Sequence, residues 1–281
     1  MVTNRPRRST LFVGALVLDA LPAALESGAD IVCIDLEDAV PPAQKDDART
    51  ALFSHLRELA VPANVELIAR VNGLRSLDGL ADVRAALGQP SPLSALLLPK
   101  VETADEICWA AALAHEATSH LNLYAIIETA QGLENCAAIA RADARLKALF
   151  FGGFDLSTAL GCTMAWEPLL YARSRVVHAA AAAGIEALDC PFADVGDLSG
   201  LRAECERVKA LGMGGKAAKH ASQVATIRAA FTPTTAEIAR ARKVVELFRA
   251  DPARPLVFEG KLIELPAIKR LERLAHQSDA P

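Results

Sequence analysis

IVCIDLED, residues 31–38, is the stretch that decides the fold, because an uninterrupted apolar run ends directly in the acidic residues Asp35, Glu37 and Asp38. Five further apolar runs also lead into a charged residue, at Arg70, Lys100, Glu128, Asp155 and Asp189. Short apolar strands are typical of a parallel sheet that is buried on both faces. A parallel barrel carries its chemistry at the carboxyl ends of its strands, so these charged residues are expected to meet there.

Eight candidate strands alternate with helical segments along the chain. They are expected at Thr10–Ala15, Ile31–Leu36, Val65–Val71, Ala95–Pro99, Leu123–Ile127, Ala148–Phe151, Ile185–Leu188 and Lys216–Lys219. Helical segments are expected between them, among others at Ala43–Ala60, Ala104–Ala117, Gly132–Ala140 and Leu198–Leu211. The repeated order of strand and helix predicts an α/β fold of the (β/α)8 TIM-barrel type, for which 281 residues are sufficient.

The C-terminal part of the sequence departs from this pattern. Thr235 begins a helix with an apolar stripe that is expected to pack on the barrel, and residues 257–263 are expected to form a hairpin. Pro266 begins a final helix. We therefore expect a catalytic barrel domain over residues 1–250 and a hairpin–helix lid over residues 251–281, which is too small to hold its own core.

The composition argues against two classes of partner. A formal net charge of −4 and a pI near 5.9 do not suit nucleic acid or an acidic membrane surface, which both favour a basic face. No apolar stretch approaches the roughly 18 residues of a membrane span, and Met1–Arg8 lacks the apolar core of a secretory signal. We therefore expect a cytoplasmic protein that binds a small molecule.

The six cysteines are widely spaced and include no C-x-x-C pair, which favours reduced thiols in the core over a zinc site. Cys190 stands apart because it follows Asp189 at a strand end, where a nucleophile could lie. No histidine lies near it in the sequence to activate its thiol.

Glu128 and Asp155 follow the fifth and sixth candidate strands. Neighbouring strands lie about 4.8 Å apart, so the two carboxylates are expected to converge at the barrel mouth. Such a pair suits Mg²⁺, which completes its octahedron with waters and substrate oxygens. Gly152-Gly153 would let a ligand and the backbone approach closely. The alternative is that each carboxylate is an ordinary solvated loop acid.

Arg70 ends an apolar run and needs an anion to stay ionised there. Its planar fork suits a carboxylate or an enolate oxygen of a substrate, and the alternative is a structural salt bridge to Asp35, Glu37 or Asp38. Two lysines raise a different chemistry, because a desolvated barrel lysine can form a Schiff base. These are Lys100, which the nearby Glu102 would keep protonated, and Lys219.

Taken in order, these motifs resemble the citrate lyase beta-subunit-like family within the wider group of HpcH/HpaI aldolases. The resemblance covers nearly the whole chain. It is carried by Arg8-Ser9, Asp35-Leu36-Glu37-Asp38-Ala39-Val40, Arg70-Val71-Asn72, Pro99-Lys100-Val101-Glu102, Ile127-Glu128-Thr129, Phe151-Gly152-Gly153-Phe154-Asp155-Leu156, Gly215-Lys216 and His220-Ala221-Ser222-Gln223. It implies Mg²⁺-dependent cleavage or formation of a C–C bond in a CoA thioester such as malyl-, citramalyl- or citryl-CoA, with an oxo acid as the other partner, in a homotrimer or hexamer.

The resemblance also implies roles for single residues. Glu128 and Asp155 would be the metal ligands and Arg70 the clamp on the oxo-acid end, while Glu37 and Asp38 would hold metal-bound waters. Near the thioester, it implies that Lys216 and the segment from His220 to Gln223 approach coenzyme A and that Arg8 reaches its phosphates. In the lid, Glu264 stands where relatives carry an aspartate that reaches a neighbouring subunit's site, and it would protonate the acyl-CoA enolate.

The chain departs from the family pattern at two further positions. Phe154 stands where many relatives have an acid, and Ala221 stands where the family usually has proline. If Glu264 positions water, the same site becomes a thioesterase. Three more functions stay open at this point: a CoA-independent metal-dependent aldolase, a beta subunit of a larger citrate lyase complex, and a binding protein that has lost catalysis.

Overall fold

A computed structural model of the chain describes residues 5–252 and 255–275, and it divides the chain into two units, Met1–Phe231 and Thr232–Pro281. The division falls earlier than the predicted boundary at residue 250. The physical reason is the packing of α11 (Thr235–Ala250), which contacts α12 (Leu265–Ala275) and belongs with it to the second unit.

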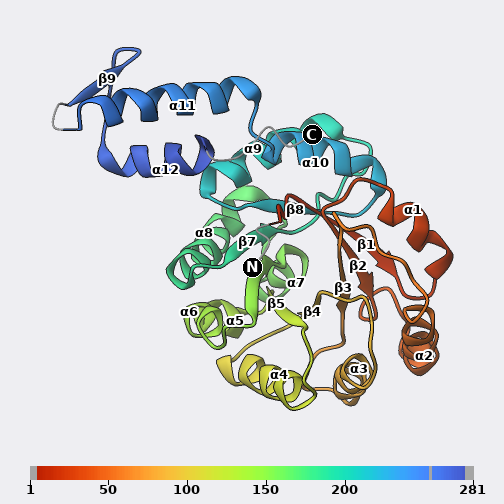
Figure 1. Cartoon of the computed structure of the whole chain (residues 1–281). Helices are drawn as coiled ribbons and strands as arrows, with labels where there is room; N and C mark the ends of the chain where they lie inside the picture. Colours follow the sequence, from red (N-terminus) through yellow and green to blue (C-terminus); the bar gives the residue numbers. More distant parts are fainter. Residues whose placement is uncertain (1–4, 253–254, 276–281) are drawn as a thin grey trace. The chain divides into compact units, whose positions relative to one another are not determined.

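The first unit is a closed barrel of parallel strands in which each strand pairs with the next and β8 pairs with β1 (Figure 1). The (β/α)8 prediction is therefore confirmed. The strands are β1 (Ser9–Gly14), β2 (Ile31–Asp35), β3 (Glu66–Arg70), β4 (Ala95–Leu98), β5 (Asn122–Ile127), β6 (Leu146–Phe151), β7 (Glu186–Asp189) and β8 (Gly215–Ala218).

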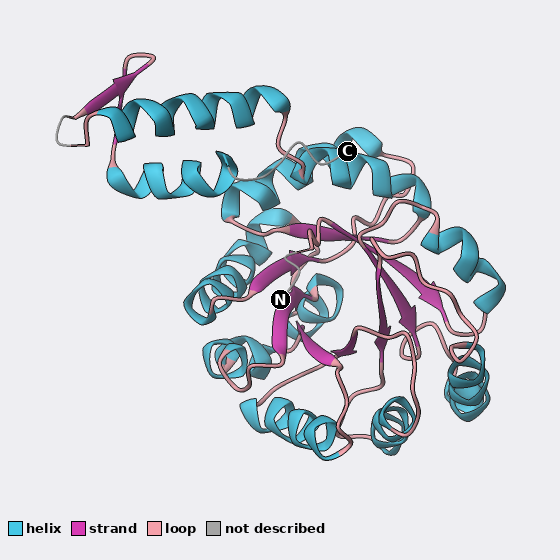
Figure 2. Ribbon diagram, in the orientation of Figure 1, coloured by secondary structure: helices cyan, strands magenta, loops and turns pink. Residues whose placement is uncertain are grey.

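Most helices of this unit surround the barrel on its outer side, as Figure 2 shows in cyan, whereas α7 (Gly153–Leu160) is seen inside the ring of strands. The helices are α1 (Leu21–Leu25), α2 (Lys45–His55), α3 (Leu77–Leu87), α4 (Ala104–Glu116), α5 (Ala130–Glu134), α6 (Cys136–Ala140), α7 (Gly153–Leu160), α8 (Trp166–Ala183), α9 (Leu198–Leu211) and α10 (Val224–Phe231), with short 3-10 turns η1 (Leu18–Ala20), η2 (Pro42–Gln44) and η3 (Ala221–Gln223). The helix predicted over 132–140 is instead split between α5 and α6. The split falls at Asn135, whose side-chain amide donates to the Glu102 carbonyl at 2.7 Å.

Two apolar cores hold the barrel together. A small one fills its interior, with Ile68, Leu97 and Phe150 among its members, and a larger one lies between the strands and the helices. Charged residues close the amino end of the interior. Arg7 there binds Glu66 through two hydrogen bonds of 2.9 and 2.8 Å and Glu186 through one of 3.1 Å. The functional site is therefore expected at the opposite end of the barrel, where the strands have their carboxyl ends.

The second unit is a helix, a hairpin and a helix. Thr234 caps α11 in a capping box, in which its hydroxyl accepts from the Glu237 N–H at 3.1 Å and the Glu237 carboxylate accepts from the Thr234 N–H at 2.7 Å. The hairpin pairs β9 (Leu256–Phe258) with β10 (Lys261–Ile263) in antiparallel register. It turns at Glu259 and Gly260 with φ of 50° and 75°, which confirms the predicted hairpin.

None of the helices within the described ranges has the length and apolar character needed to cross a membrane.

Candidate active site

A cavity of about 440 Å³ lies at the carboxyl ends of the strands. Four acidic and two basic side chains line it beside a set of apolar ones, which include Phe12, Phe150 and Phe151. The charged lining residues are Asp35, Asp38, Arg70, Glu128, Asp155 and Lys219. The charged residues at the ends of the second, third and fifth strands, and Asp155 after the sixth, therefore converge as the sequence predicted.

Arg70 is anchored by the acids at the end of β2. Its guanidinium grips Asp35, the residue opposite it in the parallel ladder, through two hydrogen bonds of 2.7 and 2.6 Å. The same guanidinium lies 2.8 Å from Glu37 and 3.3 Å from Asp38. Burial by itself would lower the pKa of Arg70, but the hydrogen bond and charge of Asp35 raise it. The structure thus contains the ion pair between Arg70 and these acids that was the alternative to a substrate clamp.

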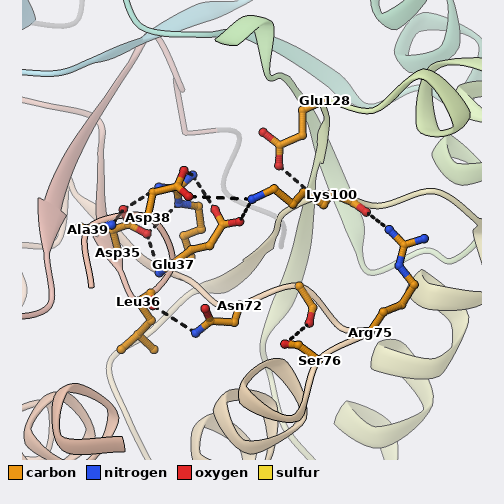
Figure 3. A network of polar contacts seen from close by, with 12 residues as sticks. Asp35, Leu36, Glu37, Asp38, Ala39, Asn72, Arg75, Ser76, Lys100 and Glu128 are labelled. Atoms are coloured by element: carbon orange, nitrogen blue, oxygen red, sulfur yellow. Dashed lines mark hydrogen bonds and ion pairs between the residues drawn. The ribbon is translucent and has the colours of Figure 1, made fainter. Parts of the chain in front are cut away.

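Lys100 links the acidic segment after β2 to Glu128 after β5 (Figure 3). Its ammonium forms an ion pair with Glu37, and its backbone N–H donates to a Glu128 oxygen at 2.8 Å. The backbone of Lys100 has a φ of 52°, a left-handed conformation that costs a non-glycine residue about 1 kcal/mol. Glu102, the predicted partner of Lys100, pairs with Arg75 instead.

Glu128 is the most perturbed carboxyl group at the cavity. It follows β5 and is only 3% exposed. Burial, followed by the charges of Glu37 and Asp155, raises its pKa to about 8. Gly152 makes room for it, because a Cβ at that position would lie 2.4 Å from the Glu128 Cβ and 2.6 Å from its Oε2. A buried acid held beside other acids gains from a cation that compensates its charge.

Glu128 and Asp155 fit the requirements of Mg²⁺. Asp155 lies in the first turn of α7, close enough to Glu128 for its charge to raise the pKa of that residue. Across residues 5–252 and 255–275, no group of three or more histidine, cysteine or acidic side chains could hold a metal. Two carboxylates beside an open cavity would suit Mg²⁺, whose remaining ligands would be waters and substrate oxygens.

The structure does not bring Arg8 and Lys216 to the cavity. Arg8 precedes β1, at the amino end of the barrel, where its guanidinium binds Asp30 through two hydrogen bonds of 2.9 Å. The Lys216 ammonium is buried in the barrel wall, 2.5 Å from Asp189 and 2.6 Å from Glu204. Their predicted approach to coenzyme A therefore has no support from their placement.

Three other candidates have different surroundings. His220 follows β8, is exposed, and caps η3 by accepting from the Ser222 N–H at 3.2 Å. Cys190 lines the cavity but is buried, and burial together with the charge of Asp189 raises its pKa to about 12, which keeps the thiol protonated. Glu264 is exposed between β10 and α12 in the second unit, so its role at the site stays a prediction.

Two contacts of the site were not foreseen from the sequence. The Arg70 guanidinium lies 5.4 Å from the centre of the Phe12 ring, and the Lys219 ammonium lies 4.2 Å from the centre of the Phe154 ring. The charged strand ends marked Arg70 and Lys219 as candidates, but nothing in the pattern of the sequence pairs them with these aromatic rings.

Replacing Arg70 tests its anchoring role. Arg70→Gln is expected to lower the free energy of unfolding by about 3 kcal/mol at pH 7, because the buried Asp35 carboxylate loses its cation and the buried Glu37 carboxylate keeps only Lys100. The loss should shrink near pH 4, because burial raises the pKa of Glu37, and protonation of Glu37 removes one of the two negative charges. Urea denaturation at both pH values measures it. Arg75→Gln is the matched control, because Arg75 is 52% exposed and its pair with Glu102 contributes less than about 1 kcal/mol. Equal losses in the two variants would contradict the prediction.

Comparison with known proteins gives a consistent result. Residues 8–221 match the family model of HpcH/HpaI aldolase/citrate lyase. The L-malyl-CoA/beta-methylmalyl-CoA lyase of Cereibacter sphaeroides is 31% identical over 98% of this chain and 95% of its own. The human protein named mitochondrial citramalyl-CoA lyase is 30% identical over 95% of this chain and 84% of its own.

Solved structures of proteins with a similar fold agree with the sequence comparisons. The protein CitE from Mycobacterium tuberculosis, in complex with magnesium, acetoacetate and coenzyme A, superimposes with a TM-score of 0.81 at 29% identity. The match covers 96% of this chain and 98% of that one. RipC from Yersinia pestis gives a TM-score of 0.72 at 39% identity, over 82% of this chain and 97% of its own.

Proposed function

The chain belongs to the HpcH/HpaI aldolase/citrate lyase family, and from that premise we propose that it is a Mg²⁺-dependent lyase that cleaves a β-hydroxyacyl-CoA thioester into an acyl-CoA and an oxo acid. Membership of the lyase class rests on the family and on relatives that are named malyl-CoA and citramalyl-CoA lyases. The observation that carries the proposal is the buried Glu128 carboxyl, which lines the cavity with Asp155 and has a pKa raised to about 8.

Glu128 and Asp155 would hold the metal ion. A bound Mg²⁺ supplies Lewis-acid polarisation of the oxygens of the hydroxy acid. Magnesium is present in the CitE structure, which supports the assignment for this chain. The glycine at position 152 keeps the Glu128 carboxylate accessible from the cavity, because any side chain there would overlap it.

Arg70 would stabilise negative charge on the substrate oxygen that becomes the product carbonyl, because it is a fixed cation at the cavity wall. Asp35 holds its guanidinium in one orientation, so that little reorganisation is needed during the reaction. Glu37 and Asp38 are proposed as positioning residues. Glu37 contacts both Arg70 and Lys100, and Asp38 contacts Arg70 and lines the cavity.

Bond cleavage requires that a base accepts the hydroxyl proton and that the C–C electron pair passes to the acyl-CoA fragment as an enolate, which must then be protonated. Glu264 is the proposed proton donor, from this protomer or from a neighbouring one in a homotrimer or hexamer. A carboxyl group on a lid could also exclude water while it acts. Glu264→Gln should then slow release of acyl-CoA more than it weakens binding of the oxo acid.

Product analysis tests the proposed reaction. The purified chain is incubated with Mg²⁺ and malyl-, citramalyl- or citryl-CoA, and separately with the corresponding free hydroxy acids. A lyase yields an acyl-CoA and an oxo acid, and only from a thioester. Free thiol with an intact hydroxy acid would indicate a thioesterase instead. Cleavage of the free acids would indicate a CoA-independent aldolase, and no turnover would leave a partner-dependent subunit or a binding protein.

Magnesium affinity should depend on pH through Glu128. The metal binds the ionised carboxylate, whereas a pKa of about 8 keeps the metal-free group mostly protonated at neutral pH. The affinity should therefore rise about tenfold per pH unit below pH 8 and level off above it. Isothermal titration calorimetry in buffers of different ionisation enthalpy measures both the affinity and the released proton. An affinity that is constant between about pH 6.5 and 9 would contradict the prediction.

A further inference from the structure

We propose that Lys219 is a specificity-determining residue that binds a second carboxylate on the oxo-acid part of the substrate. The enzyme would then favour thioesters that release an oxo dicarboxylic acid. This inference rests on the proposed lyase function and deepens it by naming a substrate class.

Lys219 lies directly after β8 and lines the same cavity as Glu128 and Asp155. Its ammonium lies over the ring of Phe154, 4.2 Å from the ring centre. Phe154 and Asp155 are consecutive residues of α7, so their Cα atoms are about 3.8 Å apart. Lys219, Phe154 and Asp155 thus line one cavity, and the ammonium lies against the ring of the residue that precedes Asp155.

The backbone on both sides of this pair is held in place. The Lys219 N–H donates to the Gln223 side chain at 2.9 Å, and Gln223 is fully buried with its amide directed to the Phe192 carbonyl at 3.3 Å. The Phe154 carbonyl accepts hydrogen bonds from the hydroxyls of Ser157 and Thr158, at 2.8 and 3.2 Å. The lysine and the ring thus meet as parts of an ordered wall.

Lys219 differs from the other cations around the cavity in its partners. Arg70 is engaged by Asp35, Glu37 and Asp38. Lys100 is engaged by Glu37, as Figure 3 shows. Lys219 forms no ion pair with any acidic residue in the described part of the chain, and its contact with an aromatic ring positions the ammonium without neutralising it. Lys219 can therefore form an ion pair with an anionic group of a ligand in the cavity.

The chemistry of the substrates indicates which anion this is. All candidate thioesters carry one carboxylate next to the hydroxyl carbon, and that group belongs with the metal ligands and Arg70. Citryl-CoA differs from citramalyl-CoA by one further carboxylate, on the methyl group of the latter. Phe12, Phe150 and Phe151 in the cavity lining offer no hydrogen bond to a second carboxylate, whereas the Lys219 ammonium does.

The test compares kcat/KM for citryl-CoA and citramalyl-CoA in the full chain with Mg²⁺. Wild type should favour citryl-CoA, and Lys219→Met should lower the ratio of the two values about 10- to 100-fold, as expected for a lost charge-assisted hydrogen bond. Lys219→Arg should restore most of the ratio. Phe154→Leu, which removes the ring under the ammonium, should lower the ratio about 3- to 10-fold. Lys147→Met, at the start of β6, is the control and should leave the ratio unchanged.

Direct binding separates this inference from the lyase proposal. With Mg²⁺ present, the affinity ratio of oxaloacetate to pyruvate should fall in Lys219→Met by a similar factor. If no thioester is cleaved, the lyase proposal fails and this binding ratio alone decides the role of Lys219. An unchanged ratio in both assays overturns the inference. So does an equal loss for all thioesters without any change in oxo-acid binding, because Lys219 would then contact coenzyme A.

Discussion

Glu128→Gln is expected to abolish Mg²⁺ binding and to lower kcat on the order of a thousandfold or more, while the metal-free protein becomes more stable. The loss of activity follows because the amide cannot supply the anionic oxygen that the metal requires. The local fold should persist, since the amide oxygen can still accept the Lys100 N–H that Glu128 accepts at 2.8 Å.

The gain in stability follows from the raised pKa. A carboxyl group with a pKa of about 8 in the folded protein and near 4.5 in the unfolded chain resists ionisation only in the folded state. This suppressed ionisation lowers the free energy of unfolding. The effect is absent near pH 4, grows above pH 4.5, and reaches its full size above pH 8. The amide removes this cost, so the free energy of unfolding should rise by about 2–4 kcal/mol at pH 8 and change little at pH 4.

Urea denaturation without metal, at both pH values, measures this change. Glu134→Gln is the matched control, because Glu134 is an exposed residue at the end of α5 and should alter neither stability nor turnover. Undiminished turnover in Glu128→Gln would refute the metal assignment. A loss of stability at pH 8 would show instead that Glu128 is ionised and well compensated in the metal-free fold.

The barrel could be predicted because its strands carry two signals at once. Most strands are short apolar runs, and most of the runs lead into a charged residue, as in β2 with Asp35 and β3 with Arg70. The order of strand and helix then leaves one common architecture. The same signals predicted that Glu128 and Asp155 lie at one cavity, because the carboxyl ends of the strands of a parallel barrel lie at the same end of the barrel.

The direction of each side chain was harder to predict. Ala217 and Ala218 both line the cavity, whereas the Lys216 side chain is buried in the wall. β8 spans only Gly215–Ala218, and Lys216 is its one residue larger than alanine. Its sequence therefore does not indicate which face is inward, and the resemblance to the family placed Lys216 near coenzyme A without that information.

The C-terminal part shows a second limit on what a sequence pattern can predict. The apolar stripe of α11 was expected to pack on the barrel, which stays a prediction, and within the second unit α11 contacts α12. An apolar stripe indicates that a helix packs against another apolar surface, but it does not indicate which surface. The hairpin between the two helices was predictable because residues 259 and 260 favour its tight turn, which is a local property.

Lys216→Met is expected to lower the free energy of unfolding by about 3–5 kcal/mol. The Lys216 ammonium is fully enclosed, where it contacts Asp189 at 2.5 Å, Glu204 at 2.6 Å and the Cys190 carbonyl at 2.7 Å. Without it, Asp189 keeps Arg173 as a cationic partner at 3.0 Å, and the charge of Glu204 loses its neighbour.

A second substitution shows whether the loss comes from uncompensated charge. Adding Glu204→Gln to Lys216→Met should recover part of the stability, with a coupling energy of about 1–3 kcal/mol in the double-mutant cycle. Lys147→Met, outside the cluster, is the control for loss of a lysine. Kinetics then separate the two roles that Lys216 could have. A structural lysine leaves KM for the thioester nearly unchanged in the folded fraction. A lysine that binds coenzyme A would raise KM severalfold with little loss of stability, and that result would contradict its placement in the barrel wall.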